Sequence, residues 1–479
     1  MRAHPSLLWL GLLAALPSRA QPARAEHDVT AQLDALISVA GGLTADVAAA
    51  KAVASSHDLR GRREQSAAAG DLVDQATVAY LPRLTVSGRA QRLSPITQPL
   101  FASVVAAPGA APGPVPAGTA LVNVPVRFGA LQNNASIDAS VQLPLSDYLL
   151  RISQAHAAAK HSEEATRLTE RAEQRTIATG ARLLFYDWAR ARLQIVIADA
   201  GVQQAAAHLE DVRNLQVAGR VVLADRLRVE AQLAAAQQLR ARALEREVVQ
   251  RERLEVLLHD PTPPSIGEDV RLPPAALGEP LEVEALVLRA LSVRPELRAL
   301  HLSTGSIELQ AKALRAFIYP RLEAVANVTF ADPNPRFFPP RDQFDLTWGV
   351  GLQLSWSPDG ALASSAGKAA LEAQARKADA DEASARDALR NEVVATVEAV
   401  RSSAVVVESS ASGLRSAEES YRSRRELFAS GRATSVELTD AETALTQARL
   451  DVIDAFIDRR IADARLRQAT GDAVESSAR

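Results

Sequence analysis

Two acidic residues near the end of the sequence are its best candidates for chemistry. Glu437 and Asp440 lie three residues apart, so a helix would place both carboxylates on one face. If several copies of the chain repeated these carboxylates around one axis, the resulting ring would favour cations, and mutual repulsion would raise some of the carboxylate pKa values. A structural alternative is open, because Thr434-Ser435-Val436-Glu437 is a capping-box pattern in which Glu437 serves the start of a helix. Asp440 lies beyond such a cap.

Other reactive side chains are scarce. The sequence has no cysteine, which excludes thiol catalysis, disulfides, iron–sulfur clusters, cysteine-bound zinc and a lipid on an N-terminal cysteine. His156 and His161 are five residues apart on a predicted helix, a poor spacing for one metal ion, and we expect both to be solvated. Neither a Ser/His/Asp constellation nor a phosphate-binding loop occurs. We therefore predict a protein that is not an enzyme and that holds no cofactor and no metal.

The composition favours long, thin helices over a broad globular core. Of the 479 residues, 47% are hydrophobic but only 4% are aromatic, and alanine, valine and leucine supply most of the apolar character. Alanine lets helices approach closely but buries little area per residue, which suits coiled coils. The net charge of −3 gives no indication of binding to nucleic acid or to anionic lipid.

The N-terminus has the pattern of a secretory signal peptide, which we assign to residues 1–25. Basic residues precede the apolar run Leu7 to Leu16, and small residues follow it. Cleavage after Ala25 or after Ala20 fits, and a short N-terminal anchor is the alternative. We find no other segment that approaches a membrane-spanning helix.

The rest of the sequence contains the same series of motifs twice. Pro82-Arg83-Leu84 recurs as Pro320-Arg321-Leu322, and Ala218-Gly219-Arg220 recurs as Ser430-Gly431-Arg432. We therefore predict an internal duplication, with its parts as follows: a first structural repeat at 26–258, a proline-rich linker at 259–280, a second repeat at 281–471 and a tail at 472–479.

Each repeat is predicted to contain a β-hairpin, at 84–146 and at 322–357. Apolar and polar residues alternate along the strands of these segments, most clearly from Phe344 to Trp356, although Val325 breaks the polar face of the second hairpin. Between the first two strands, residues 94–126 read as a loop rich in proline, alanine and glycine. Phe344, Trp348 and Trp356 lie toward the ends of the apolar face, where membrane barrels place interfacial rings. We favour a membrane barrel over the alternative, a soluble hairpin with one face on a core.

A long helical hairpin is predicted to follow each β-hairpin, at 149–258 and at 362–470. Val393, Val400, Val407, Leu414, Tyr421 and Phe428 fall every seventh residue, which is typical of a coiled-coil seam. Each long helix ends at a glycine, the usual residue just past a helix end.

Four membrane strands per chain cannot form a closed barrel, and open strand edges are not tolerated in lipid. Several copies must therefore share one barrel. Two copies would supply eight strands and three would supply twelve, and the residues alone do not choose between them.

The chain resembles the TolC-like outer membrane efflux proteins over about residues 29–472. The order, spacing and duplication of several loose motifs carry the resemblance. They are Tyr80-Leu81-Pro82-Arg83-Leu84, Arg294-Pro295-Glu296-Leu297-Arg298-Ala299-Leu300, Phe428-Ala429-Ser430-Gly431-Arg432 with Val436-Glu437-Leu438-Thr439-Asp440-Ala441-Glu442-Thr443-Ala444-Leu445, and Arg465-Leu466-Arg467-Gln468-Ala469-Thr470-Gly471-Asp472.

This resemblance implies an α+β membrane protein that forms a homotrimer, with a 12-stranded outer membrane β-barrel and a long α-helical coiled-coil tunnel in the periplasm. It implies the exit duct of a tripartite efflux or type I secretion system, which passively conducts substrates from an inner-membrane transporter and a periplasmic adaptor protein. The alternative from another class is a structural periplasmic coiled-coil adaptor or scaffold. Drugs, metal ions and proteins are not separable as substrates.

The resemblance also implies a channel gate at the two helix turns. Asp225 corresponds to the family's gating acid in the first turn, and Glu437 and Asp440 to its two acidic ring positions in the second. The sequence departs from the family at Ala433, where some members have a basic residue, and Arg432 precedes it; an Asp225–Arg432 bridge is therefore a hypothesis. Before the second turn, the resemblance leads us to expect an aromatic residue with a hydroxyl group. This sequence has Phe428 there, which excludes a side-chain hydrogen bond from that position. The adaptor would touch the tip at Gly219, Arg220, Gly431 and Arg432.

Overall fold

A computed structural model describes residues 29–96, 100–109, 111, 113–126, 131–261, 264–274 and 282–472. The predicted signal peptide, with both of its candidate cleavage positions, lies outside the described residues, as do part of the predicted linker and nearly all of the tail. Within the described ranges, no helix combines the length and the apolar character needed to cross a membrane. The predicted combination of helices with antiparallel strands is confirmed, because the chain is mostly helical and contains a four-stranded sheet.

The chain divides into two compact units. The first, which we call the sheet unit, comprises residues 58–173 and 294–388, and the second, the helical unit, comprises residues 1–57, 174–293 and 389–479. Two helices, α5 (Ser153–Val217) and α9 (Pro358–Ala429), begin in the sheet unit and end in the helical unit.

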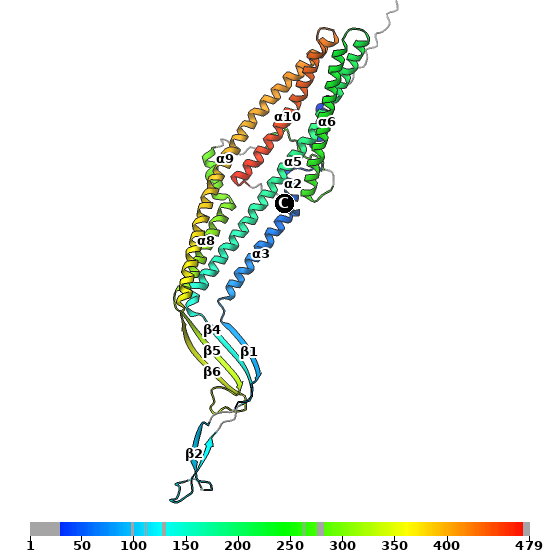
Figure 1. The fold of residues 1–479 in the computed structure, drawn as a ribbon. Helices are drawn as coiled ribbons and strands as arrows, with labels where there is room; N and C mark the ends of the chain where they lie inside the picture. The colour runs from blue at the N-terminus through cyan, green and yellow to red at the C-terminus, as the bar shows by residue number, and fades with distance from the viewer. Residues whose placement is uncertain are drawn as a thin grey trace, which may run out of the picture. The chain divides into compact units, whose positions relative to one another are not determined.

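The sheet unit is built on four antiparallel strands in the order β1-β4-β5-β6 (Figure 1). They are β1 (Arg83–Arg92), β4 (Asn133–Leu143), β5 (Arg321–Asp332) and β6 (Asp345–Ser355). The register is continuous across the sheet; for example, Ser87 pairs with Asp138, Asp138 with Thr329 and Thr329 with Thr347. Each repeat thus contributes one pair of strands, and β4 joins β5 at the centre.

The register separates polar from apolar side chains onto opposite faces of the sheet. Because neighbouring residues in a strand point to opposite faces, paired residues share a face. The face that contains Asp138 also holds polar or small residues from every strand, namely Thr85, Ser87, Arg89, Ser136, Ser140, Gln142, Glu323, Asn327, Thr329, Asp345, Thr347, Gly349, Gly351 and Gln353. Val325, which pairs with Gln142 and Gly351, is an apolar exception on this face. The other face is apolar, with Leu84, Val86, Ile137, Ala139, Val141, Leu322, Ala324, Ala326, Val328, Phe330, Leu346, Trp348, Val350, Leu352 and Leu354.

The large apolar side chains of this sheet are not covered within the chain. Val350 is 73% exposed, and Leu352 and Leu354 are each 70% exposed. The strands at the two ends of the order, β1 and β6, each pair on one side only. The sheet therefore presents an exposed apolar face and two open edges.

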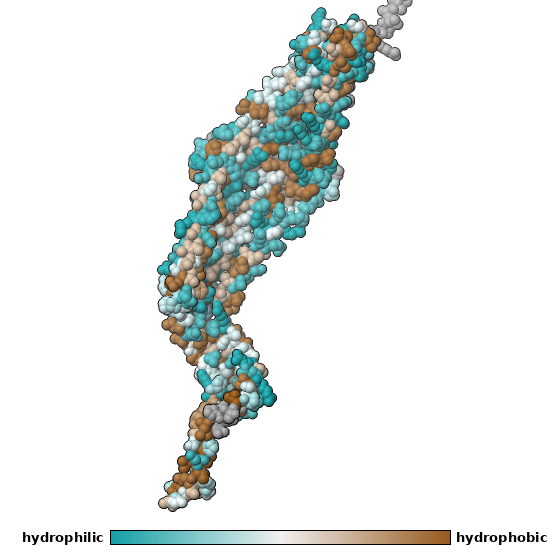
Figure 2. Space-filling model, in the orientation of Figure 1, coloured by the Kyte–Doolittle hydropathy of each residue, from teal (hydrophilic) through white to brown (hydrophobic). Residues whose placement is uncertain are grey.

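The segment predicted to be a loop at 94–126 contains a second sheet, which corrects that prediction. Strands β2 (Ala102–Ala106) and β3 (Val122–Val126) pair antiparallel. No charged residue occurs between Arg92 and Arg127, and the surface over this excursion is largely brown in Figure 2. Proline-rich composition concealed the short strands, because proline normally weakens the case for a strand.

Helices continue the sheet unit beyond its strands, and a buried carboxylate fixes one junction. α4 (Leu145–Asp147), a π-helical turn (Tyr148–Ile152) and α5 follow β4 without a break. Asp147 is buried; it accepts hydrogen bonds from Arg151 (Nη2–Oδ2 2.9 Å) and Arg321 (Nη2–Oδ2 3.1 Å). The ring of Phe317 lies 5.5 Å and 5.9 Å from the two guanidinium carbons.

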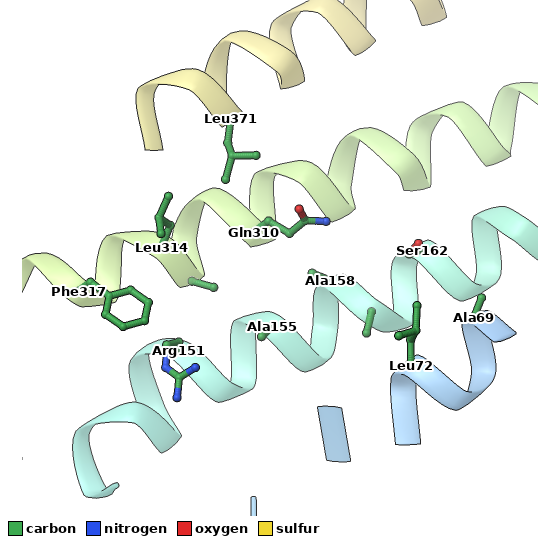
Figure 3. Close-up of a pocket in the computed structure, with 12 residues that line it drawn as sticks. Ala69, Leu72, Arg151, Ala155, Ala158, Ser162, Gln310, Leu314, Phe317 and Leu371 are labelled. Carbon is green, nitrogen blue, oxygen red and sulfur yellow. The ribbon is translucent and has the colours of Figure 1, made fainter. Parts of the chain in front are cut away.

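An apolar groove of about 490 Å³ lies among the helices of the sheet unit. Its walls come from α3 (His57–Val78), α5, α8 (Pro295–Arg315), a 3₁₀ turn (Ala316–Ile318) and α9. Arg151 and Phe317 lie at one end, and Leu72 and Ser162 lie toward the other (Figure 3).

The helical unit holds the largest core of the described chain. It contains α1 (Val29–Leu36), α2 (Ala45–Ser55), α6 (Leu223–Leu258), α7 (Val283–Val293), α10 (Ser435–Thr470) and the later parts of α5 and α9. Phe185 and Trp188 of α5 are fully buried against residues of α2, α6 and α10. The seam residues Val393, Val397 and Val400 of α9 are also buried.

The proline-rich segment packs against the N-terminal helices. The first helical stretch is interrupted near Gly41-Gly42 and again at Ser56, whereas Gly61 lies inside α3. The predicted linker is partly anchored, because Ile266 and Val270 are core residues. Ile266 also forms an isolated parallel β-bridge with Leu43. Gly42 and Gly267 permit this approach, since a Cβ on Gly267 would lie 2.3 Å from the Gly42 carbonyl oxygen.

Replacing Trp188 tests how much a hydrogen bond to a buried carboxylate stabilises this core. The buried Trp188 Nε1–H donates to Glu247 Oε1 (3.3 Å). We expect Trp188→Phe to lower the free energy of unfolding by about 1–3 kcal/mol, because Glu247 loses a buried donor. Adding Glu247→Leu should recover part of that loss in thermal or denaturant unfolding. An equal or larger loss in the double variant would show that lost ring volume is responsible.

Candidate functional site

Two tight turns join the long helices of the helical unit, and the predicted site residues lie at or just after them. The first turn (218–222) links α5 to α6, and the second turn (430–434) links α9 to α10 (Figure 1). Both turns have the same backbone hydrogen bonds. In the first, Gly219 N–H donates to Gln216 and Arg220 N–H donates to Leu215; in the second, Gly431 N–H donates to Phe428 and Arg432 N–H donates to Leu427.

These bonds form the Schellman arrangement, which satisfies carbonyl groups left free at a helix end. The arrangement requires a left-handed residue, and Gly219 (φ 71°) and Gly431 (φ 72°) supply it without the steric penalty of a Cβ. Each turn then exposes an arginine, Arg220 or Arg432. The glycines therefore set the geometry, and the arginines supply positive charge at both turns.

The capping-box alternative for Glu437 is present in the structure. Thr434 N–H donates to Glu437 Oε2 (2.9 Å), and Glu437 N–H donates to Thr434 Oγ1 (3.3 Å). Arg424 Nη1 lies 2.8 Å from Glu437 Oε1. The Thr434 backbone and hydroxyl, followed by the charge of Arg424, hold the pKa of the Glu437 carboxyl below its usual value. Glu437 thus joins α10 to α9 as well as capping α10.

The other predicted gate residues are less constrained. Asp440 is exposed and Asp225 is half-buried. In the described ranges, no ion pair joins Asp225 to Arg432 within the chain. Asp440 lies one turn beyond Glu437, whereas the neighbouring Leu438 and Thr439 are buried. Charge at the start of α10 is therefore directed away from the packed side of the helix.

A buried polar network beside the second turn was missed by sequence reasoning. His208 of α5 places Nδ1 3.1 Å from Glu442 Oε2 and Nε2 3.2 Å from Ser435 Oγ, both on α10. The Phe428 ring packs edge-on against the imidazole, with centroids 5.3 Å apart. A histidine within an otherwise aliphatic seam was the available signal, but nothing in the sequence pairs it with residues more than 200 positions away.

The aromatic residues assigned to a membrane interface are all exposed, and they lie in or next to β6. Phe344 stacks on Phe330, with ring centroids 4.9 Å apart. The Nε1–H group of Trp356 donates to the Ile318 carbonyl, with 3.1 Å between nitrogen and oxygen. Trp348 is 64% exposed and pairs with Val328 on the apolar face. Phe344 and Trp356 immediately precede and follow the strand, whereas Trp348 lies within it.

The expectation that His156 and His161 are fully solvated is wrong. Both are half-buried in the sheet unit. His156 packs edge-on against Tyr80 (5.6 Å), and Nδ1 of His161 is buried near Gly305, where a Cβ would lie 2.8 Å from it. The described residues contain no cluster of three or more metal-ligating side chains.

Comparisons with known proteins agree with the resemblance inferred from the sequence. Residues 286–472 match the model of the outer membrane efflux protein family. No functionally curated protein matches the chain. Solved structures do: the outer membrane protein VceC of Vibrio cholerae is 15% identical, with a TM-score of 0.70 over 92% of this chain and 96% of that one.

Two further structures share the fold. The CmeC outer membrane channel of Campylobacter jejuni is 11% identical, with a TM-score of 0.72 over 90% of this chain and 86% of that one. The MtrE outer membrane channel of Neisseria gonorrhoeae, solved in an open state, is 16% identical, with a TM-score of 0.68 over 89% and 88%. The fold likeness thus extends over both repeats.

The lowered pKa of Glu437 predicts an acid-sensitive start of α10. A carboxyl whose folded pKa is depressed stabilises the fold above its unfolded value, and that stability is lost as the pH falls through the folded pKa. We expect the amides of residues 435–438 to exchange hydrogen faster as the pH falls below about 4.5, after correction for intrinsic exchange. Glu437→Gln should remove this pH dependence. Exchange that responds identically to pH in both proteins would contradict the assignment.

Proposed function

We propose, because residues 286–472 match the model of the outer membrane efflux protein family, that the chain is an outer membrane efflux channel. In this proposal it serves as the exit duct of a tripartite efflux or type I secretion system. Substrates pass through it passively from an inner-membrane transporter and a periplasmic adaptor protein to the outside.

One observation carries the proposal: the sheet has one polar face, one exposed apolar face and two open edges. In water, so large an uncovered apolar face is unfavourable. In a bilayer the same face meets hydrocarbon, while the polar face lines an aqueous interior. The strands contain between 10 and 12 residues, close to the length a tilted membrane strand needs.

The two open edges support a homotrimer. In lipid, the free backbone groups of β1 and β6 must find partners, and β1 of one copy can pair with β6 of the next. Three copies give a closed barrel of 12 strands, which is wide enough for a pore. We propose that the long helices of the same three copies form a coiled-coil tunnel in the periplasm, and that the barrel lies in the outer membrane.

We assign the gate and the docking tip to the two helix turns. Asp225, Arg432, Glu437 and Asp440 would ring the narrow end of the tunnel, repeated by the threefold axis. Gly219, Arg220, Gly431 and Arg432 would meet the adaptor, because two exposed arginines at glycine-closed turns form a rigid basic surface. Phe344, Trp348 and Trp356 would lie at the membrane interfaces, and residues 1–25 would direct export.

A pair of arginine substitutions on β6 tests the barrel. Val350 lies on the apolar face and Gln353 on the polar face. Within a barrel, Val350→Arg should destabilise the assembly by up to about 2–4 kcal/mol, because the guanidinium enters lipid. Gln353→Arg should be tolerated. The measurement is the yield and melting temperature of heat-resistant oligomers extracted from outer membranes.

The same pair distinguishes the barrel from a soluble periplasmic scaffold. In a soluble protein both positions would face water, so the two variants should behave alike. Equal yields of both variants, or a parent protein that is monomeric and absent from outer membranes, would contradict the barrel and the trimer together.

Conductance in planar bilayers tests the channel and its gate. We expect Asp440→Asn to reduce cation selectivity several-fold, since a unit charge acts with about 1 kcal/mol at 4 Å in water. Asp225→Ala combined with Arg432→Ala should change the conductance. Glu418→Gln is the control, since it removes an exposed carboxylate of α9 roughly 18 Å from the second turn at 1.5 Å per residue. Unchanged conductance and selectivity in the gate variants would refute the gate.

A further inference from the structure

The network of His208, Ser435 and Glu442 is the most completely buried polar cluster beside the helix turns. His208 is 3% exposed, and Ser435 and Glu442 are each 5% exposed. Leu209 and Val212 of α5, Val229 of α6, Phe428 of α9 and Leu438 of α10 form the surrounding apolar cluster. Burying a histidine and a carboxylate among such residues is unfavourable unless each polar atom finds a partner.

The hydrogen-bond roles in the network follow from the chemistry of its members. An ionised carboxylate only accepts, so Nδ1–H of His208 donates to Glu442 Oε2. In the neutral ring, Nε2 then accepts the hydroxyl proton of Ser435. Both ring nitrogens are thereby satisfied from one neighbouring helix. A displacement of α10 along α5 by one residue, about 1.5 Å, would break both bonds at once.

The network holds a particular part of α10. Ser435 is the first residue of the helix, and Glu442 lies two turns further on. Glu437 and Asp440 lie between them in sequence, and Asp440 is exposed while the network residues are buried. His208 contacts the buried face of α10. Because the helix is rigid, this contact also fixes the direction in which Glu437 and Asp440 point.

We propose that His208 is a positioning residue for the gate: it sets the register of α10 against α5 through Ser435 and Glu442, and so aims Glu437 and Asp440. The assignment of those acids to a gate rests on the proposed function, whereas the positioning itself does not. Buried polar groups are best attested in this role, because an apolar seam alone tolerates sliding that a polar pair forbids.

Two spin labels can report the register of α10 against α5 directly. Because the parent chain has no cysteine, labels attach only to cysteines that are introduced. Arg220→Cys and Arg432→Cys place one spin label on each turn. Diluting labelled chains with an excess of unlabelled ones leaves a single labelled chain in nearly all oligomers that carry a label. Pulsed electron–electron double resonance then gives the distance distribution between the two turns of that chain. Planar-bilayer conductance of the unlabelled variants is the second readout.

The informative variant replaces the imidazole and the carboxylate together with apolar side chains of similar size, His208→Phe with Glu442→Met. Such a replacement avoids the unpaired buried charge that a single substitution leaves, and the assembly should keep a melting temperature near that of the parent. We expect its distance distribution to broaden about twofold, because the apolar seam no longer selects one register. Cation selectivity should fall with it. Glu442→Gln, which keeps an acceptor oxygen, should retain the narrow distribution.

A matched control removes another polar contact between the same two helices. Gln194 Nε2–H of α5 donates to Asp454 Oδ1 of α10 (2.8 Å), farther from the turns. Gln194→Ala should leave the distance between the labels as narrow as in the parent. A narrow distribution in the His208→Phe, Glu442→Met variant, or equal broadening in the Gln194→Ala variant, would overturn the proposal. A parent that does not conduct would refute the proposed channel, but would leave the distance measurement intact.

Discussion

The sheet cannot satisfy all of its interactions within one chain, and the rest of the structure follows from this constraint. Backbone groups on the outer sides of β1 and β6 have no strand partners, and side chains such as Val350 and Leu352 have no protein cover. Both deficits disappear together if copies join edge to edge in a lipid environment. The helices that leave the sheet then share its symmetry. In the proposed trimer, each charge at the helix turns would be present three times.

The two repeats are equivalent in their helix ends but unequal in their helix starts. The Schellman bonds at Gly219 and Gly431 are the same. By contrast, Val222 is the N-cap residue of α6 and provides no side-chain cap, whereas α10 begins with a capping box and is also held by Arg424 and His208. More groups therefore fix the second helix start than the first. The duplication supplies two similar hairpins, and these additional contacts make one of them the better-defined element.

Local periodicity accounts for what the sequence could predict. The alternation from Phe344 to Trp356 predicted β6, and the glycines at 219 and 431 predicted helix ends, because each pattern reflects a constraint within a few residues. The β2–β3 pairing and the anchoring of Ile266 against Leu43 were missed. His208 was missed for the same reason: its partners lie on another helix, and a single sequence records no pairing over that distance.

Glu437 and Asp440 of α10 cannot contribute equally to the proposed cation-attracting ring. The Glu437 carboxylate already accepts bonds from Thr434 and faces Arg424 at 2.8 Å, so much of its charge is compensated within its own chain. Asp440 is exposed, and no ion pair to it occurs in the described part of the chain. Glu437 therefore mainly holds the helix start, and in the proposed gate Asp440 would carry the charge that a passing ion meets. The one-turn spacing that made the pair conspicuous is what permits this division, since it keeps Asp440 beyond the reach of the cap.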